Sequence, residues 1–510
     1  MPVSRRTFLA GVAGAGAVAA TLAACGTGSG GGSGSGERGG RLRAAFVAGG
    51  STETLDPAKL PQFVDQSRAK ACFDTLGRWE QDMSCTPRLA ESWEADATGT
   101  RWRITLKDAK FHDGRPVRSA DVLYTYRRVA DPATTASAAA LFSKVDFTAS
   151  RAIDDRELEI VLGAPDFLFF VALGALGSEI VPEGTTNFAA PIGSGPFRFV
   201  SFTPGGPALY KRNDAYWDGA PLLDELEFVP IADESARVGA LLSGQIEYAH
   251  DIRATSAQQL ESDSRAKVLV APLAAFQFLY VKHDRPPFND PRLREALVLG
   301  LDREALARVA LLGRGRPGND MFGKGLQYYP NAVPQRSRDV ERAKSLVRES
   351  GVTTVELSTG VTDPSWASAT QLVVAQLAEI GLTVQVKTVP PETYFADVRK
   401  NATMHFGRTG TLPIQNWIAT TQLSTMINNS FGKVNDPEID RLYNEALGSA
   451  DEAARSAAIG TALTRIHDSV AAPIWGISDW NVGVSANVNG LAGSRPNTYD
   501  WANFSKASLG

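Results

Sequence analysis

The spacing of apolar side chains switches repeatedly between two residues and three to four residues along this chain. Trp102, Ile104 and Leu106 alternate with polar residues, as in a half-buried strand, whereas apolar residues within 122–129 recur at helical spacing. The same patterns predict strands at 158–162, 197–199, 226–228, 276–281 and 382–386, and helices beginning at Ser119, Asp302 and Asp339 and covering 238–246 and 372–380. The repeated change between strand spacing and helix spacing predicts an α/β protein with mixed sheets.

Length and charge narrow the class of protein further. The chain has 510 residues, of which 43% are hydrophobic and 21% charged. A chain of this size exceeds what one hydrophobic core usually organises, so we expect two or more lobes. The formal net charge is −4 and no run of Lys or Arg occurs, which argues against nucleic acid as a partner.

The N-terminus carries two export signals that agree with each other. Residues 4–9 (Ser-Arg-Arg-Thr-Phe-Leu) form a twin-arginine motif, and residues 22–25 (Leu-Ala-Ala-Cys) match the pattern at which bacterial lipoproteins are lipidated and cleaved. The stretch between them is short and rich in Gly, which disfavours a membrane span. We therefore expect a signal peptide at 1–24 and a lipid anchor on Cys25 that holds the chain on the extracytoplasmic face of the membrane.

The anchor is followed by residues 25–40, which after Cys25 are almost entirely Gly and Ser. Such a segment buries no apolar surface and behaves as a flexible tether, with a reach of about 20 Å as a Gly-rich coil. The expected order is therefore anchor, tether and folded body.

The body contains no recognisable catalytic or metal-binding motif. Its five histidines lack metal-ligand spacing, so we expect no metal site and no cofactor. Residues 313–318 fit Gly-x-Gly-x-x-Gly, but they follow a helical pattern and include Pro317, so we interpret them as a loop. Cys72 and Cys85 either form a disulfide, as an exported protein permits, or are two separate thiols.

Several sequence blocks follow one another in a consistent order along the body. They are Glu-Thr-Leu-Asp-Pro-Ala at 53–58, Leu-Ala-Glu-Ser-Trp-Glu at 89–94, Phe-His-Asp-Gly-Arg-Pro-Val at 111–117, Pro-Ile-Gly-Ser-Gly-Pro-Phe at 191–197, and 213–219, 223–226, 288–296 and 301–304. Together these blocks resemble the peptide/nickel-binding family (family 5) of the extracytoplasmic solute-binding proteins of ABC importers, and the resemblance covers essentially the whole body.

The resemblance implies a two-lobed periplasmic-binding-protein fold of type II, similar to cluster C, with a hinged cleft. Lobe I would comprise 41–275, with an extra subdomain at about 80–189, and lobe II would comprise 276–486. Residues 487–510 would return to lobe I.

The resemblance also suggests ligand-binding positions. Thr52 and Glu53 belong to the loop after the first strand, which lines the cleft in the family. Arg408 stands where the family usually has an aromatic residue, and Thr411 where peptide binders have the aspartate that pairs with the peptide's ammonium group. This departure argues against recognition of a free peptide N-terminus, because a buried ammonium without a carboxylate is unfavourable.

Two readings of these side chains stay open. Arg408 suits bidentate pairing with a ligand carboxylate or phosphate, or a bridge to a neighbouring acid of the protein. Trp417 and Trp475 suit the flat walls of a ligand site, or ordinary core packing.

The resemblance implies a monomeric, non-enzymatic receptor that captures a peptide or similar small solute and delivers it to an ABC permease. The sequence does not distinguish between a peptide, a sugar, an opine and a metal chelate as the ligand. The alternatives are a tethered sensor for a signalling partner and a secreted enzyme.

Overall fold

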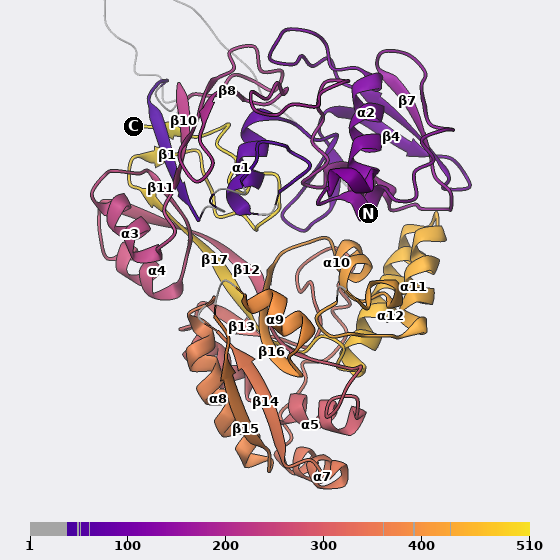
Figure 1. Ribbon diagram of the computed structural model, residues 1–510, viewed down its shortest axis with the longest axis vertical. Helices are drawn as coiled ribbons and strands as arrows, with labels where there is room; N and C mark the ends of the chain where they lie inside the picture. Colours follow the sequence, from indigo (N-terminus) through magenta and orange to yellow (C-terminus); the bar gives the residue numbers. More distant parts are fainter. Residues whose placement is uncertain are drawn as a thin grey trace, which may run out of the picture. The chain divides into compact units, whose positions relative to one another are not determined.

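One mixed sheet of eleven strands runs through the part of the protein that the structure describes (Figure 1). The computed structural model describes residues 38–47, 50, 53–60, 62–360, 362–390, 393–428 and 430–510, which belong to one compact unit. The strand order is β15 (Thr383–Thr388), β14 (Thr354–Thr359), β16 (Met404–Gly410), β12 (Ala266–Val281), β17 (Ile474–Ser485), β11 (Tyr248–Ile252), β1 (Arg41–Phe46), β10 (Glu225–Pro230), β9 (Ala208–Arg212) and β8 (Phe197–Phe202), with β13 (Gly315–Pro317) paired to β17 off this path.

Three smaller sheets accompany the main one among the described residues. Four strands form the sheet β4 (Ala90–Ala95), β5 (Arg101–Leu106), β7 (Glu157–Val161) and β6 (Arg151–Ala152). Two-stranded sheets pair β2 (Gly77–Trp79) with β3 (Cys85–Pro87) and β18 (Val488–Asn489) with β19 (Ser508–Leu509). The mixed α/β class is therefore confirmed.

Two groups of parallel strands lie at opposite ends of the main sheet. β1 runs parallel to β10 and β11, and β14 runs parallel to β15 and β16. The long strands β12 and β17 pair with each other antiparallel and join the two groups (Figure 1). The expected strand at 276–281 is thus only the second half of β12, whose first half pairs with the end of β17.

The ladder between β12 and β17 is interrupted at two places, a larger one between Ala271 and Ala275 and a smaller one between Gln277 and Phe278. Ala271 pairs with Trp480 and Ala275 with Ser478, so three residues of β12 lie opposite the single residue Asp479. Leu273, in the middle of this bulge, has φ = 53°, and its amide donates a hydrogen bond to Asp479 Oδ1 at 3.1 Å. Bulges of this kind bend a strand and increase its twist.

The helices begin and end at residues that local chemistry favours. Asp302 and Asp339 each accept a hydrogen bond from the backbone three residues on, and Gly351 ends its helix with φ = 70°. Ser119 is the first helical residue rather than the cap; the N-cap is Arg118, whose amide donates to Asp121 Oδ2 at 2.8 Å. The helices are α1 (Phe63–Cys72), α2 (Ser119–Ala130), α3 (Glu234–Leu242), α4 (Ala254–Glu261), α5 (Pro291–Gly300), α6 (Arg303–Ala310), α7 (Val340–Ser350), α8 (Ser365–Glu379), α9 (Tyr394–Lys400), α10 (Ile414–Thr421), α11 (Pro437–Gly448) and α12 (Glu452–Asp468).

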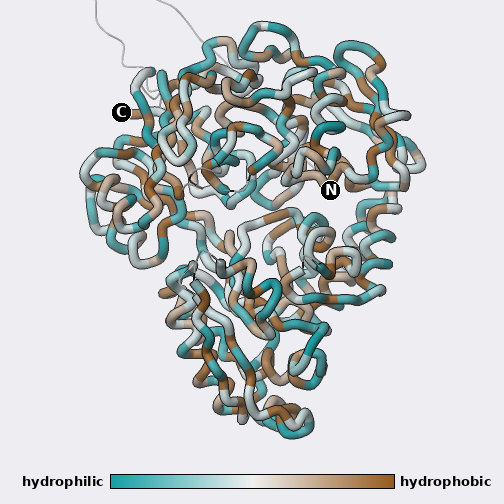
Figure 2. Tube along the Cα trace, viewed as in Figure 1, coloured by the Kyte–Doolittle hydropathy of each residue, from teal (hydrophilic) through white to brown (hydrophobic). Residues whose placement is uncertain are grey.

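Hydrophobic cores form on both sides of the joining strands. One core packs α1 and the C-terminal segment against β1, β8 and β10, and another packs α5 to α9 against β14 and β16. A third core joins the four-stranded sheet and α2 to α10, α11 and α12, so segments far apart in sequence share one apolar interior. Hydrophobic and hydrophilic residues alternate along the described trace (Figure 2), and no described helix is long and apolar enough to cross a membrane.

Candidate functional site

The candidate site lies where the carboxyl ends of the two parallel strand groups meet. Asp251 lies near the end of β11 and is followed by Arg253, the residue that precedes α4. Arg408 lies near the end of β16, and Asp363 lies between β14 and α8. Ligands of open α/β sheets bind outside the carboxyl ends of their strands, so this is the expected position for a binding site.

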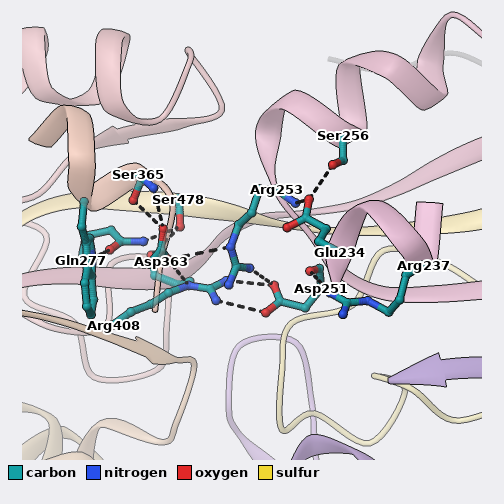
Figure 3. A network of polar contacts seen from close by, with 12 residues as sticks. Glu234, Arg237, Asp251, Arg253, Ser256, Gln277, Asp363, Ser365, Arg408 and Ser478 are labelled. Carbon is teal, nitrogen blue, oxygen red and sulfur yellow. Dashed lines mark hydrogen bonds and ion pairs between the residues drawn. The ribbon is translucent and has the colours of Figure 1, made fainter. Parts of the chain in front are cut away.

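These four side chains form one ion-pair cluster (Figure 3). Arg408 Nη1 and Nη2 donate to the two oxygens of Asp251, each at 3.2 Å, in a bidentate pair. Arg253 also donates to Asp251, and Arg408 Nε lies 3.5 Å from Asp363 Oδ2. Residues of both strand groups are thereby bound to one another.

The cluster is largely buried, and its arginines keep the acids ionised. Burial by itself would raise the pKa of the Asp251 carboxyl, but Arg253 and Arg408 hold that pKa far below its usual range. The pKa of Asp363 is likewise lowered by the same two arginines, against the effect of burial. The Arg408 guanidinium also stacks 4.4 Å from the ring centroid of Trp480, which holds it in place from a second side.

A cavity of 240 Å³ opens beside this cluster. Its charged lining comprises Arg253, Arg314, Arg408, Asp363 and Asp479, and its neutral polar lining includes Gln277, Ser365, Ser478 and Asn481. Asn481 Oδ1 is buried and has no hydrogen-bond partner among the described residues, and Arg253 Nε meets only Asp363 Oδ2, at 4.0 Å. A cavity with both signs of charge and an unpaired acceptor suits a solute that is itself zwitterionic.

His250 lies within an aromatic group next to the cluster. Its ring stacks on Phe46 at 4.4 Å between centroids and lies within 5.6 Å of the rings of Trp480 and Trp501. Burial lowers the pKa of His250 to about 3, so the imidazole is neutral at ordinary pH.

Of the expected site residues that the structure describes, only Arg408 lies in the cavity lining. Thr411 is fully buried and donates from Oγ1 to the Ala274 carbonyl at 2.9 Å. Glu53 is buried and accepts from Arg68 Nη2 at 2.7 Å. Thr52 lies outside the described residues.

The two tryptophans lie in hydrophobic cores. The Trp417 ring stacks on Phe322 with centroids 4.7 Å apart, and Trp475 is fully buried in the core of α5 to α9. Neither belongs to the cavity lining. Of the two uses considered for them, core packing describes their surroundings.

Asp251, Arg253 and Asp363 are site residues that sequence reasoning missed. Asp251 and Arg253 flank Ile252 at the end of a strand pattern, and Asp363 precedes a helix pattern. Charged residues directly after buried strands were the available signal, since such positions lie at the carboxyl edge of a sheet.

The cysteines and the glycine-rich segment have ordinary surroundings. Cys72 and Cys85 are both free thiols. Of the two possibilities considered for them, the structure shows two separate cysteines and no disulfide between them. Residues 315–317 of the glycine-rich segment form β13 against β17, so the interpretation of this segment as a loop is wrong for these three residues, which gain backbone pairing with β17. They open no helix, as a dinucleotide-binding segment would. No group of His, Cys, Asp or Glu that could hold a metal ion occurs among the described residues, and Cys25 lies outside them.

Comparisons with known proteins agree with this architecture. The family model for bacterial extracellular solute-binding proteins, family 5, matches residues 84–431. Glutathione-binding protein GsiB of Pectobacterium atrosepticum is 27% identical over 371 residues, which cover 69% of this chain and 71% of GsiB.

Two solved structures share the fold. AgaA of A. tumefaciens R10, in complex with agropinic acid, has a TM-score of 0.78 and 25% identity, covering 92% of this chain and 99% of AgaA. DppA of Helicobacter pylori has a TM-score of 0.79 and 19% identity, covering 93% of this chain and 98% of DppA. The fold is therefore that of the two-lobed periplasmic binding proteins.

The protein is a binding protein rather than an enzyme, and its family places it outside the cytoplasm. The chain belongs to family 5 of the bacterial extracellular solute-binding proteins.

Proposed function

We propose that the protein captures a small zwitterionic solute, an amino-acid conjugate or short peptide, in the cavity between the two strand groups and delivers it to an ABC permease. The observation that carries this proposal is the 240 Å³ cavity, which Arg253 and Arg408 line together with Asp363 and Asp479. Charged groups of a ligand would meet partners of opposite sign there, and each such bond is stronger than one between neutral groups.

The relative GsiB supports the same ligand class. GsiB is named as a glutathione-binding protein, whereas the agropinic acid solved with AgaA carries a carboxylate but no ammonium group. Glutathione carries one ammonium and two carboxylates, which matches a cavity lined by both arginine and aspartate. Asp363 and Asp479 would receive the ammonium in place of the aspartate that Thr411 replaces, so the expectation drawn from Thr411 does not extend to this cavity. The ligand would contact both strand groups and so stabilise their closed arrangement.

We further propose that the signal peptide at 1–24 is removed and that Cys25 is lipidated, with 25–40 as the tether. The two-acyl anchor of such a lipoprotein is sufficient for stable membrane attachment. A tethered receptor searches only the membrane surface for its permease, which raises the effective concentration of one for the other. Lobe I at 41–275 and 487–510, and lobe II at 276–486, would close on the solute as a monomer.

The test is calorimetric titration of residues 41–510 with glutathione, agropinic acid and N-acetylated glutathione. We expect glutathione to bind, and we expect weaker binding of N-acetylated glutathione and of agropinic acid because both lack the ammonium group. A ligand at a hundred times its Kd adds about 2.7 kcal/mol of stability, so a thermal-shift screen gives an independent readout. Binding of neutral oligosaccharides alone would overturn the assignment of the ligand class.

A second measurement distinguishes a function in import from a function in signalling. Uptake of the radiolabelled ligand should disappear when the gene is deleted and return with the intact gene. Ligand binding without any loss of uptake in the deletion strain would favour the tethered sensor.

A further inference from the structure

A second cavity, of 250 Å³, lies between the small sheet region and the helices α10 and α11. One wall comes from 140–144 and 166–172, around η3 (Ala139–Phe142) and η4 (Phe169–Gly174), and the other from 415–426 and 443–447, which include η5 (Ser424–Met426). It shares no lining residue with the cavity beside Arg408. It is therefore a separate site.

Two buried carboxamides in its wall lack partners. Gln415 and Asn416 have exposed fractions of only 3% and 8%. Gln415 Nε2 and Asn416 Nδ2 form no hydrogen bond with any described residue. Buried donors are nearly always satisfied, because an unpaired one loses its hydration without compensation. A ligand with an acceptor oxygen would restore these bonds.

The rest of the lining indicates an uncharged ligand. Apolar side chains predominate, among them Leu141, Phe169 and Met426. The charged groups Lys144 and Asp166 lie 3.5 Å apart and neutralise each other. A charged ligand would have to leave water without gaining a counterion, which is unfavourable.

We propose that this cavity binds a free, small, uncharged molecule that combines an apolar body with an amide or ester carbonyl. The carbonyl oxygen accepts from the carboxamides of Gln415 and Asn416, and the apolar body packs against the aliphatic and aromatic lining. Because the two walls come from different parts of the chain, which meet where the Phe167 amide donates to the Leu447 carbonyl at 2.8 Å, the occupant also holds those parts together.

The methionine content permits a direct test. The full sequence contains five methionines, and Met426 lines the cavity whereas Met404 is fully buried in the core of α5 to α9. With ¹³C-labelled methionine methyl groups, N-acetyl-leucinamide should shift the Met426 resonance in a saturable titration and leave that of Met404 in place. Absence of a Met426 shift up to the solubility limit of the probe would overturn the proposal.

Variants identify the groups involved. Gln415→Leu and Asn416→Ala should each weaken the titration about tenfold, the effect of about 1.4 kcal/mol. Gln422→Leu is the matched control, because Gln422 is also a buried carboxamide near the end of α10 but lies outside the cavity lining, and it should leave the titration unchanged. Equal affinity in all three variants would also overturn the proposal.

The result is independent of the proposed zwitterion site. Arg408→Ala alters the first cavity and should leave the Met426 titration unchanged. A Met426 shift without any zwitterion binding would support this inference while the proposed function failed.

Discussion

Asp251 and Arg408, 157 residues apart in sequence, form a bidentate ion pair with both oxygen–nitrogen distances at 3.2 Å. Asp251 comes from the strand group of β1, and Arg408 from the strand group of β14. The pair therefore fastens the two halves of the sheet together at the edge where the ligand cavity opens.

Asp251→Asn should destabilise the fold. The substitution keeps the shape of the side chain but leaves Arg253 and Arg408 with Asp363 as the one carboxylate between them. Breaking a buried pair in this way costs about 3–5 kcal/mol. Urea unfolding followed by tryptophan fluorescence measures the loss. Asp155→Asn is the control, because the Asp155 side chain is exposed and forms an ion pair with the equally exposed Arg118, and its unfolding midpoint should not move. Equal midpoints for both variants would contradict the importance of the buried cluster.

Arg408→Ala should weaken binding of a zwitterionic ligand by about 2 kcal/mol or more, as loss of a buried charged pair does. Arg408→Lys should bind with intermediate affinity, because it keeps the charge but not the bidentate geometry. Calorimetric titration measures both. Arg441→Ala is the control, since Arg441 is exposed and pairs within its own helix. An unchanged Kd in Arg408→Ala would assign this arginine to the protein's internal pairs alone.

His250 should make the protein less stable in acid. Its pKa of about 3 lies below the usual value of 6.5, so the unfolded chain binds a proton between these pH values that the folded protein does not. Stability is therefore complete above pH 6.5 and falls toward pH 3, by up to about 1.4 kcal/mol per pH unit for one group. His250→Phe keeps the stacking on Phe46 and should flatten the dependence by about one proton, as urea unfolding across this range would show. An identical slope in both proteins would mean that His250 is not buried neutral.

Cys25→Ser should release the protein from membranes without changing ligand affinity. The serine cannot form the thioether to diacylglycerol, so the chain loses its anchor while the folded body is unaltered. Membrane fractionation and immunoblotting measure this. Cys85→Ser, which changes a thiol of the folded body, should stay in the membrane fraction. Retention of Cys25→Ser in membranes would refute the lipid anchor.

Local chemistry made much of the fold predictable. The helices after Asp302 and Asp339 begin where expected because an aspartate that accepts from the third helical amide is a local signal. The strand at 102–106 is predictable because buried apolar residues and more exposed polar residues alternate along its whole length. Such elements need no knowledge of what packs against them.

The site was less predictable because its contacts are distant in sequence. Arg408 was recognised as unusual, but its partner Asp251 lies in another strand group, and no periodicity relates the two positions. A tryptophan is common both in the walls of ligand sites and in hydrophobic cores. For Trp417 and Trp475, only the packing around each ring distinguishes these two roles. Sequence reasoning thus reached one residue of the candidate site, Arg408, and missed the others.

The bulge at Leu273 bears on how such a receptor is emptied. The two halves share one continuous sheet, yet the ladder between β12 and β17 is already interrupted opposite Asp479. If a permease separates the halves as proposed, both strands can bend at this point while the paired segments on either side keep their backbone hydrogen bonds. The sheet then offers little resistance to opening, and the Asp251–Arg408 pair, which joins the same two halves, is the contact that opening must break.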